Sequence, residues 1–176
     1  MPASSNERLS LLAQWREDWI AHQKDWFNPG FRAIVVHRFG NWRMTIRPKL
    51  LRAPFSVLYR MMYRRILRSY GIELSYSTVV GRRTAFHHQG GIVINGACVI
   101  GDDCVIRHGV TMGIRYEDRL TEVPTVGNGV SIGVGAILLG GIHVGDGAKI
   151  GANSLVLCDV PPGASAIGSP ARIVFS

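Results

Sequence analysis

Aliphatic side chains recur every six residues over the second half of the chain. The series begins at Ile94 and contains one longer step, between Met112 and Val126. Its members are Ile94, Ile100, Ile106, Met112, Val126, Ile132, Leu138, Val144, Ile150 and Val156. A helix has a period of 3.6 residues and a half-buried strand a period of 2, so neither explains this spacing. A glycine often follows the aliphatic residue, and a small or β-branched residue lies four positions after it. This unit predicts a mainly β fold, a β-solenoid with an inward aliphatic residue on each flat face and a glycine at each corner.

Two interruptions of the six-residue period mark the places where the predicted solenoid must bulge. The step from Val80 to Ile94 is as long as the step from Met112 to Val126, so the two breaks have the same length. The first break holds residues 86–91 (Phe-His-His-Gln-Gly-Gly), and the second holds the charged stretch 114–122. Function in repeat proteins collects on such loops, so the candidate chemistry is expected there.

The N-terminal part of the chain has a helical pattern instead. Ser4 and Glu7 have the spacing of a capping box, and apolar residues follow them at helical intervals. A break at residues 28–30 ends this pattern. A second helix is expected from Phe31 to about Met44, and a third with Pro54 in its first turn. We expect these helices to form an α-helical cap that packs on the end of the solenoid.

Charge divides the chain in the same way. Residues 1–70 contain 13 Lys and Arg against 4 Asp and Glu, whereas residues 71–176 contain 7 against 8. We therefore divide the chain into a basic helical region, 1–74, and a hexapeptide-repeat domain, 75–176. The excess of positive charge lies in the helical region alone, which argues against a nucleic-acid-binding protein. A basic amphipathic helix can lie on an anionic membrane surface, so peripheral association with the inner membrane face is compatible with the cap.

The cysteines and the N-terminal residues bear on disulfides, metal sites and the cellular compartment. Three cysteines do not make a disulfide framework, and no Cys or His pair has zinc spacing, so no metal is expected. The start of the chain lacks the apolar run of a signal peptide. A cytoplasmic protein is the expectation.

Histidines cluster at the first break. His87 and His88 lie in it, and His108 follows. A histidine can take a proton from a hydroxyl at neutral pH, provided that another group orients its ring. Glu73 precedes His88 by slightly less than the length of one coil, and the repeat alone leaves open whether the two side chains meet.

Three segments resemble the serine O-acetyltransferases, which are hexapeptide-repeat acyltransferases. The segments are Gly71-x-Glu73 through His87-His88-Gln89-Gly90-Gly91, Ile100-Gly101-Asp102-Asp103 through Thr111-Met112-Gly113, and Val160-Pro161-Pro162 through Pro170-Ala171-Arg172-Ile173-Val174. The resemblance covers about residues 71–174. It implies a left-handed parallel β-helix with three hexads per coil, acetyl-CoA as donor, and a homotrimer that holds the donor between subunits.

The resemblance also implies roles for individual residues. His88 aligns with the catalytic histidine, and Glu73 occupies the place of an orienting aspartate. The segments that hold CoA in the family match Gly113, Gly133, Val134, Lys149, Gly151, Ala152, Pro170 and Arg172. Lys149 and Arg172 suit the phosphates of CoA because they are cations on otherwise neutral repeats.

The acceptor is less clear from the sequence, because the chain departs from the family at two positions. His87 stands where an aspartate binds the ammonium of serine, and Glu122 stands in the Arg-His pair that binds its carboxylate. An acid there would repel a carboxylate, although Arg115 or Arg119 on the same loop could replace the missing cation. The chain also resembles short colanic-acid-type exopolysaccharide acetyltransferases. The favoured acceptor is therefore a sugar hydroxyl of an exopolysaccharide precursor, and L-serine is the alternative. An inactive binding solenoid is a third interpretation.

The candidate acceptor-binding residues come from the two breaks and the coil between them. They are His87, Gln89, His108, Arg115, Tyr116, Arg119 and Glu122. Their hydroxyl, amide, imidazole and carboxylate groups can exchange hydrogen bonds with a sugar, and the Tyr116 ring could pack on a pyranose face.

Overall fold

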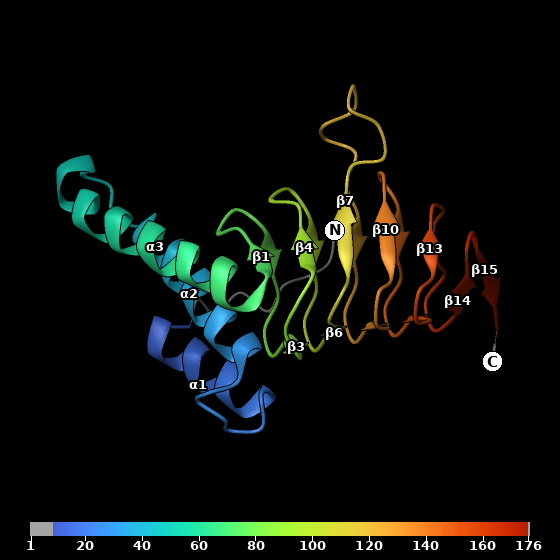
Figure 1. The fold of residues 1–176 in the computed structure, drawn as a ribbon, viewed down its shortest axis with the longest axis horizontal. Coiled ribbons are helices and arrows are strands. Elements are labelled where there is room, and N and C mark those ends of the chain that lie inside the picture. The colour runs from blue at the N-terminus through green and yellow to red at the C-terminus, as the bar shows by residue number, and fades with distance from the viewer. Residues whose placement is uncertain (1–8, 176) are drawn as a thin grey trace.

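Three helices precede a β-solenoid in the computed structural model, which describes residues 9–175 (Figure 1). The helices are α1 (Leu11–Ala21), α2 (Pro29–Arg43) and α3 (Lys49–Tyr70). None of them, within the described residues, is long and apolar enough to cross a bilayer. The mainly β fold with a helical cap is confirmed.

Fifteen short strands make the solenoid. In chain order they are β1 (Ile72–Leu74), β2 (Val79–Val80), β3 (Ala85–His87), β4 (Ile92–Ile94), β5 (Val99–Ile100), β6 (Val105–Arg107), β7 (Thr111–Gly113), β8 (Thr125–Val126), β9 (Ser131–Ile132), β10 (Ile137–Leu139), β11 (His143–Val144), β12 (Lys149–Ile150), β13 (Leu155–Val156), β14 (Ser165–Gly168) and β15 (Ala171–Val174).

The strands form three sheets, which are the three flat faces of the solenoid. Sheet A has the order β1-β4-β7-β10-β13, sheet B has β11-β8-β5-β2, and sheet C has β15-β14-β12-β9-β6-β3. All pairs are parallel except β14 with β15, which is antiparallel. In Figure 1 the chain climbs the near face, sheet A, while successive coils advance to the right, so the helix is left-handed.

The six-residue series lies inside the solenoid, as predicted. Each of the ten aliphatic side chains from Ile94 to Val156 is at most 3% exposed. The residues four positions later are buried as well, among them Cys98, Cys104 and Ala136. Parallel pairing stacks each aliphatic residue on its counterpart in the next coil, so each coil buries its neighbour's interior face.

The strand register gives each break its size. Ile132 pairs with Ile150, which lies three hexads further along the chain, so a regular coil consists of three hexads. Phe86 pairs with Ile106, and Ile106 pairs with Ile132, so the two coils that contain the breaks are longer than a regular one. The first break inserts two residues between β3 and β4, where sheet C meets sheet A. The second inserts eight between β7 and β8, where sheet A meets sheet B, and this insertion is the loop at the top of Figure 1. The expectation that the two breaks have the same length was wrong, because Phe86 takes an inward position of the series within the first step and leaves only two extra residues there.

The helix starts differ from the expected ones. Ser4 and Glu7 lie outside the described residues, and the N-cap of α1 is Ser10, whose Oγ accepts from the Ala13 N–H at 3.3 Å. The expectation that α3 starts with Pro54 in its first turn was wrong, because α3 already begins at Lys49. A proline there removes the hydrogen bond to the Leu50 carbonyl. Leu50 is 86% exposed, so water can satisfy that carbonyl.

Helix α2 covers the first coil of the solenoid. Gly30 lies directly on the backbone of Phe86 in β3, where a Cβ atom would have no room. Arg38 forms a buried ion pair with Asp18 of α1, with its Nε 3.0 Å from Oδ2. The same guanidinium donates to the carbonyls of Val80 and Gly81 at 2.6 Å. One arginine thus ties α1, α2 and the first coil together.

A second polar contact between cap and solenoid involves His37. Its Nδ1 lies 2.9 Å from the Ser75 carbonyl and its Nε2 lies 3.0 Å from the Asn41 amide nitrogen. Nδ1 therefore donates and Nε2 accepts, which is the neutral form. Burial lowers the pKa of His37 from 6.5 to about 3, and the positive charge of Arg38 adds to this effect.

We predict that His37 makes the fold sensitive to acid. The unfolded state takes up a proton near pH 6.5, whereas folded His37 does so only near pH 3, so stability must fall as the pH falls between these values. From pH 7 to pH 5 this one group should cost about 2 kcal/mol. The His37→Gln variant should lose less stability over the same interval, measured by urea unfolding at fixed protein concentration. The matched control is His143→Gln on the exposed side of β11. Equal acid losses in wild type and His37→Gln would contradict the prediction.

Candidate active site at a solenoid corner

Equivalent positions of four coils stack at the corner between sheets C and A. His88, His108, Val134 and Ala152 each follow the sheet C strand of their coil. The Gly135 N–H donates to the His108 carbonyl at 3.0 Å, and the Asn153 N–H donates to the Val134 carbonyl at 2.7 Å. A hydrogen-bonded strip therefore runs along the solenoid axis from His108 to Ala152, and the Gly109 N–H links it to the Gly90 carbonyl of the His88 turn at 2.9 Å.

His88 lies at the head of this strip, in the turn that the two extra residues enlarge. Its backbone has φ +68°, a left-handed conformation that non-glycine residues seldom adopt. The turn is held by the Gly90 N–H, which donates to the Tyr70 carbonyl at 2.8 Å. The His88 side chain is exposed. Arg83, Asp103 and Asn153 have the same left-handed backbone, so it belongs to the turns of the solenoid, and the exposure of His88 is what makes its ring accessible to a ligand.

His108 lies directly beside His88, one coil further on. The two ring centroids are 5.5 Å apart, and the rings are nearly perpendicular at 82°. The His108 Nδ1 is buried and has no hydrogen-bond partner among the described residues. A buried polar atom without a partner is costly, so a bound molecule at this point would satisfy it.

His87 lies next to His88 but belongs to sheet C. It pairs in register with Arg107, whose guanidinium donates to the Ser131 hydroxyl at 3.2 Å. Burial, and then the charges of Arg107 and His88, lower the pKa of His87 below 6.5. His87 is therefore neutral at pH 7. Gln89, on the other side of His88, is exposed.

Glu73 is the middle residue of β1 on sheet A, in register with Val93 of β4. It points outward from β1, which starts just after Gly71, and Gly71 packs on Gly90 and Gly91. No hydrogen bond joins Glu73 to His88 in the described part of the chain. Glu73 also faces α3, because its charge adds to the effect of burial in raising the pKa of Tyr63. The structure thus places Glu73 on sheet A and beside α3, without a hydrogen bond to His88 among the described residues.

The loop of residues 114–122 lies at the other edge of sheet A. Within one chain, the width of this sheet separates it from His88. The Arg115 and Arg119 guanidinium groups lie over the Tyr116 ring, 5.1 and 5.4 Å from its centroid. Arg119 also approaches the Glu122 carboxylate at 3.6 Å. The acid predicted to repel a carboxylate therefore has a cation beside it.

The residues matched to CoA binding occupy four places, of which the corner strip is the first. Gly133, Val134, Gly151 and Ala152 lie on the corner strip, whereas Gly113 lies at the opposite edge of sheet A, where the loop begins. Lys149 is exposed on β12 of sheet C.

Pro170 and Arg172, the other two residues matched to CoA binding, belong to the hairpin of β14 and β15. Pro170 is in its turn, and Arg172 is exposed on β15. Neither Lys149 nor Arg172 has an acidic partner among the described residues. Coils lie about 4.8 Å apart, so the strip suits an extended ligand with its reactive end at His88 and its anionic end at these cations. No three His, Cys, Asp or Glu side chains of residues 9–175 are grouped as a metal site requires.

Two contributors to this corner escaped the sequence analysis. Tyr70 holds the His88 turn through its carbonyl, and Arg107 acts on His87 through register. The neighbourhood of Arg107 and His87 could have been predicted from the sequence. The first break adds two residues to its coil, so residue 107 lies beside residue 87 and residue 108 beside residue 88.

The stacked hexads place this chain among the hexapeptide-repeat proteins. The family model "Bacterial transferase hexapeptide (six repeats)" matches residues 124–158. The serine acetyltransferase of Synechococcus elongatus is 35% identical over 151 residues, 84% of this chain and 57% of that protein's length. The "Putative colanic acid biosynthesis acetyltransferase WcaB" of Escherichia coli K12 is 40% identical over 79% of this chain and 84% of its own.

Solved structures agree with these relatives. Soybean serine acetyltransferase in complex with serine superposes with a TM-score of 0.79 at 33% identity, covering 94% of this chain and 70% of that one. A serine acetyltransferase has also been solved in complex with CoA. The chain therefore belongs to the serine acetyltransferase family of acetyl-CoA-dependent transferases.

Proposed function

We propose that this chain is an O-acetyltransferase that moves an acetyl group from acetyl-CoA to a hydroxyl. The observation that carries the proposal is the exposed, left-handed His88 at the head of the corner strip. A molecule bound at His88 would also satisfy the buried Nδ1 of His108 beside it, which has no partner among the described residues.

The proposed mechanism is general-base catalysis. A ring nitrogen of His88 accepts the proton of the acceptor hydroxyl while the oxygen attacks the thioester carbonyl carbon of acetyl-CoA. The resulting tetrahedral intermediate collapses with cleavage of the carbon–sulfur bond. The CoA thiolate leaves and takes the proton back from His88, so the products are an acetyl ester and CoA. Glu73 is the proposed positioning residue for the His88 ring, with its carboxylate turning to the ring when substrates bind.

The donor is proposed to lie along the corner strip. Small residues at positions 133–135 and 151–152 leave room for the narrow pantetheine arm. Lys149 and Arg172 are proposed to bind the phosphates.

The acceptor that the comparisons favour is L-serine, in preference to the sugar hydroxyl that the sequence favours. Serine acetyltransferases recur among the relatives and the solved structures. The loop also weakens the objection to serine, because Arg119 partly neutralises Glu122 and Arg115 is close by. A sugar hydroxyl remains the second candidate, supported by the 40% identity to the colanic acid relative.

His88→Ala should lower the rate of CoA release by about 10²- to 10⁴-fold, which is the usual loss for a general base. The KM for acetyl-CoA should change little, whereas a Lys149→Gln, Arg172→Gln double variant should raise that KM. Glu73→Gln should give a smaller loss of kcat and a shifted pH profile. The control is His143→Ala, far from the corner. Near-normal turnover by His88→Ala would remove the residue from the mechanism.

The acceptor can be identified by thiol release with L-serine and with exopolysaccharide repeat units. We expect serine to be acetylated with a kcat/KM of at least about 10⁴ M⁻¹s⁻¹, the lower end of ordinary efficiency. If Arg119 binds the serine carboxylate, Arg119→Gln should raise the KM for serine about 10- to 150-fold with little change in kcat. Acetylation of the glycan but not of serine would assign the sugar instead.

We further propose a cyclic homotrimer in which the loop 114–122 of one copy completes the His88 corner of its neighbour. The support is that these two parts lie at opposite edges of sheet A within one chain. His88→Ala and a loop-deleted variant should each be inactive, and mixed trimers should recover about one quarter of wild-type activity at equal amounts. Light scattering should give the mass of a trimer. Mixed assemblies without activity would contradict a shared site.

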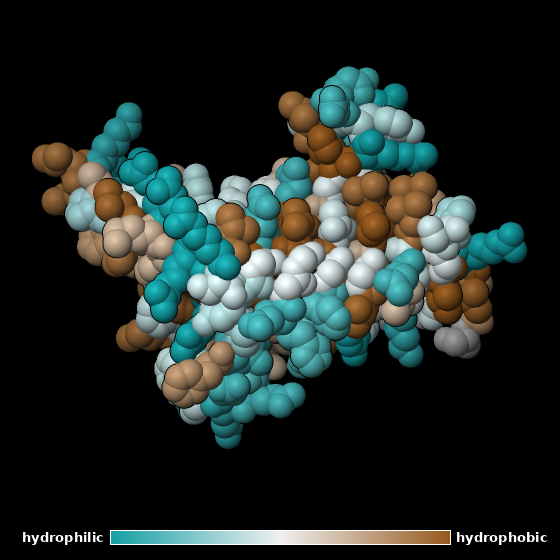
Figure 2. All heavy atoms as spheres, viewed as in Figure 1, coloured by the Kyte–Doolittle hydropathy of each residue, from teal (hydrophilic) through white to brown (hydrophobic). Residues whose placement is uncertain are grey.

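Peripheral association with the inner face of the cytoplasmic membrane is also a proposal. Its support is the outer side of α3, which combines exposed Leu50, Leu51 and Met61 with arginines (Figure 2).

A further inference from the structure

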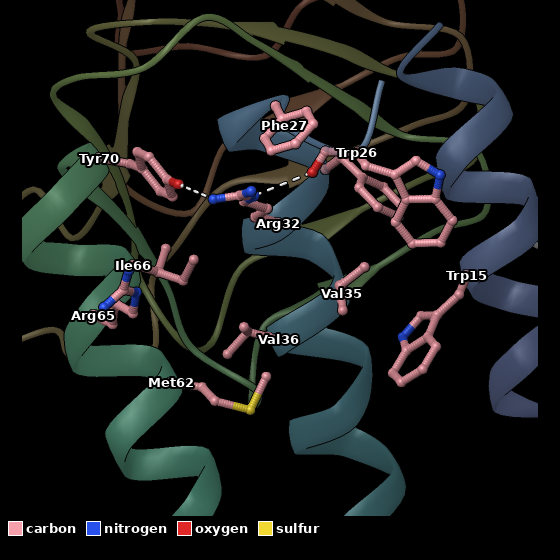
Figure 3. Close-up of a pocket in the computed structure, with 11 residues that line it drawn as sticks. Trp15, Trp26, Phe27, Arg32, Val35, Val36, Met62, Arg65, Ile66 and Tyr70 are labelled. Carbon is pink, nitrogen blue, oxygen red and sulfur yellow. Dashed lines mark hydrogen bonds between the residues drawn. The ribbon is translucent and has the colours of Figure 1, made fainter. Parts of the chain in front are cut away.

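A cavity of about 450 Å³ lies between the three helices of the cap, outside the corner strip (Figure 3). Its inner wall is apolar or aromatic, formed by Trp15, Phe31, Val36, Met62 and Ile66. Ligand pockets of proteins typically have this size and this lining, with a few placed polar groups.

Arg32 and the Tyr70 hydroxyl lie together at one end of the cavity, and Arg65 lies further along α3 beside Ile66. Figure 3 shows Arg32 between Tyr70 and Phe27, above the apolar wall. The Arg32 Nη1 donates to the Tyr70 hydroxyl at 2.7 Å, and its Nε donates to the Trp26 carbonyl at 3.1 Å. The guanidinium lies 5.2 Å from the centroid of the Phe27 ring. These neutral contacts fix Arg32 in place and leave its charge uncompensated. Arg65 of α3 is a second cation on the cavity lining.

The acidic residues of the described cap are used elsewhere. Glu17 pairs with Arg82, and Asp18 pairs with Arg38. Asp25 accepts the Phe27 N–H at 2.8 Å. Within residues 9–175, no carboxylate forms an ion pair with Arg32 or Arg65. The cavity therefore combines a long apolar wall with two cations that have no anion.

The Trp15 indole adds a buried polar atom that has no hydrogen-bond partner. It lines the cavity, and its Nε1 is buried without a hydrogen-bond partner in the described chain. The entrance is flanked by Trp26 and Phe27, which are 62% and 77% exposed. Such large aromatic side chains are seldom left in water without a partner surface.

We propose that this cavity binds a single-chain lipid phosphate. The aliphatic or isoprenoid chain lies against the apolar wall, and the phosphate lies on Arg32 and Arg65, because a guanidinium binds phosphate oxygens in a bidentate manner. The proposal goes beyond acetyl transfer and does not rest on it. The site adjoins the catalytic corner, however, since Tyr70 binds Arg32 through its hydroxyl and the Gly90 N–H of the His88 turn through its carbonyl.

The test is calorimetric titration of the assembled wild-type protein with monomeric decyl phosphate. We expect saturable binding of one molecule per chain. Octyl phosphate, two CH₂ groups shorter, should bind about 15-fold more weakly, since each buried CH₂ contributes about fourfold. Decanol, which lacks the anion, should bind at least about tenfold more weakly, and inorganic phosphate should not bind measurably.

Substitutions at the two cations separate a built site from general surface charge. Arg65 is exposed, so Arg65→Gln should fold normally and weaken decyl phosphate about tenfold. Arg68→Gln, on the same helix but outside the cavity, is the matched control and should bind like wild type. Val35→Trp, which fills the cavity, should abolish binding, with folding checked by circular dichroism.

Three results would overturn the proposal. They are the absence of saturable binding, equal binding by wild type and Arg65→Gln, and an equal loss in Arg68→Gln. None of these measurements involves acetyl transfer, so a failed lipid site and a failed enzymatic assignment are distinguishable.

Discussion

The hydrogen-bonded stacking of coils is the constraint on which the rest of this structure depends. No coil has a core of its own, because Ile106 is buried only by lying between Phe86 and Ile132 of the neighbouring coils. The ladder that enforces this stacking tolerates no extra residue within a strand, since one residue would turn inward side chains outward. Insertions are therefore confined to corners. Both candidate segments of the site, the His88 turn and the loop 114–122, follow from this restriction.

The same constraint explains why the helical cap and the candidate active-site corner are joined by direct contacts. The first coil has no preceding coil to satisfy its backbone groups or cover its interior. Arg38 binds the carbonyls of Val80 and Gly81, and the His22 Nε2 accepts the Phe86 N–H at 3.0 Å. Phe86 lies just before His87 and His88, so the cap fixes the backbone from which the proposed base projects.

The sequence predicted the buried positions of the solenoid well. It predicted the side-chain contacts of the candidate site only in part. The period of six identifies inward positions because a parallel stack repeats the same packing in every coil. The stacking of His88 on His108 also follows from spacing, once the two extra residues are counted. Other features depend on side-chain conformations and on packing among distant helices, and no period encodes them. These are the pairing of Arg119 with Glu122, the unsatisfied Nδ1 of His108, the early start of α3 and the cavity between the helices.

The antiparallel hairpin of β14 and β15 sets a limit that the repeat itself does not contain. A parallel stack can in principle be extended by any chain that offers the same strands, which is how fibres grow. On sheet C the last strand, β15, runs in the opposite direction to the others, so a further parallel coil would not find its hydrogen-bonding partners there. At the other end, α2 covers the first coil. The molecule is thus protected at these places against end-to-end polymerisation, and its length is a property of one chain.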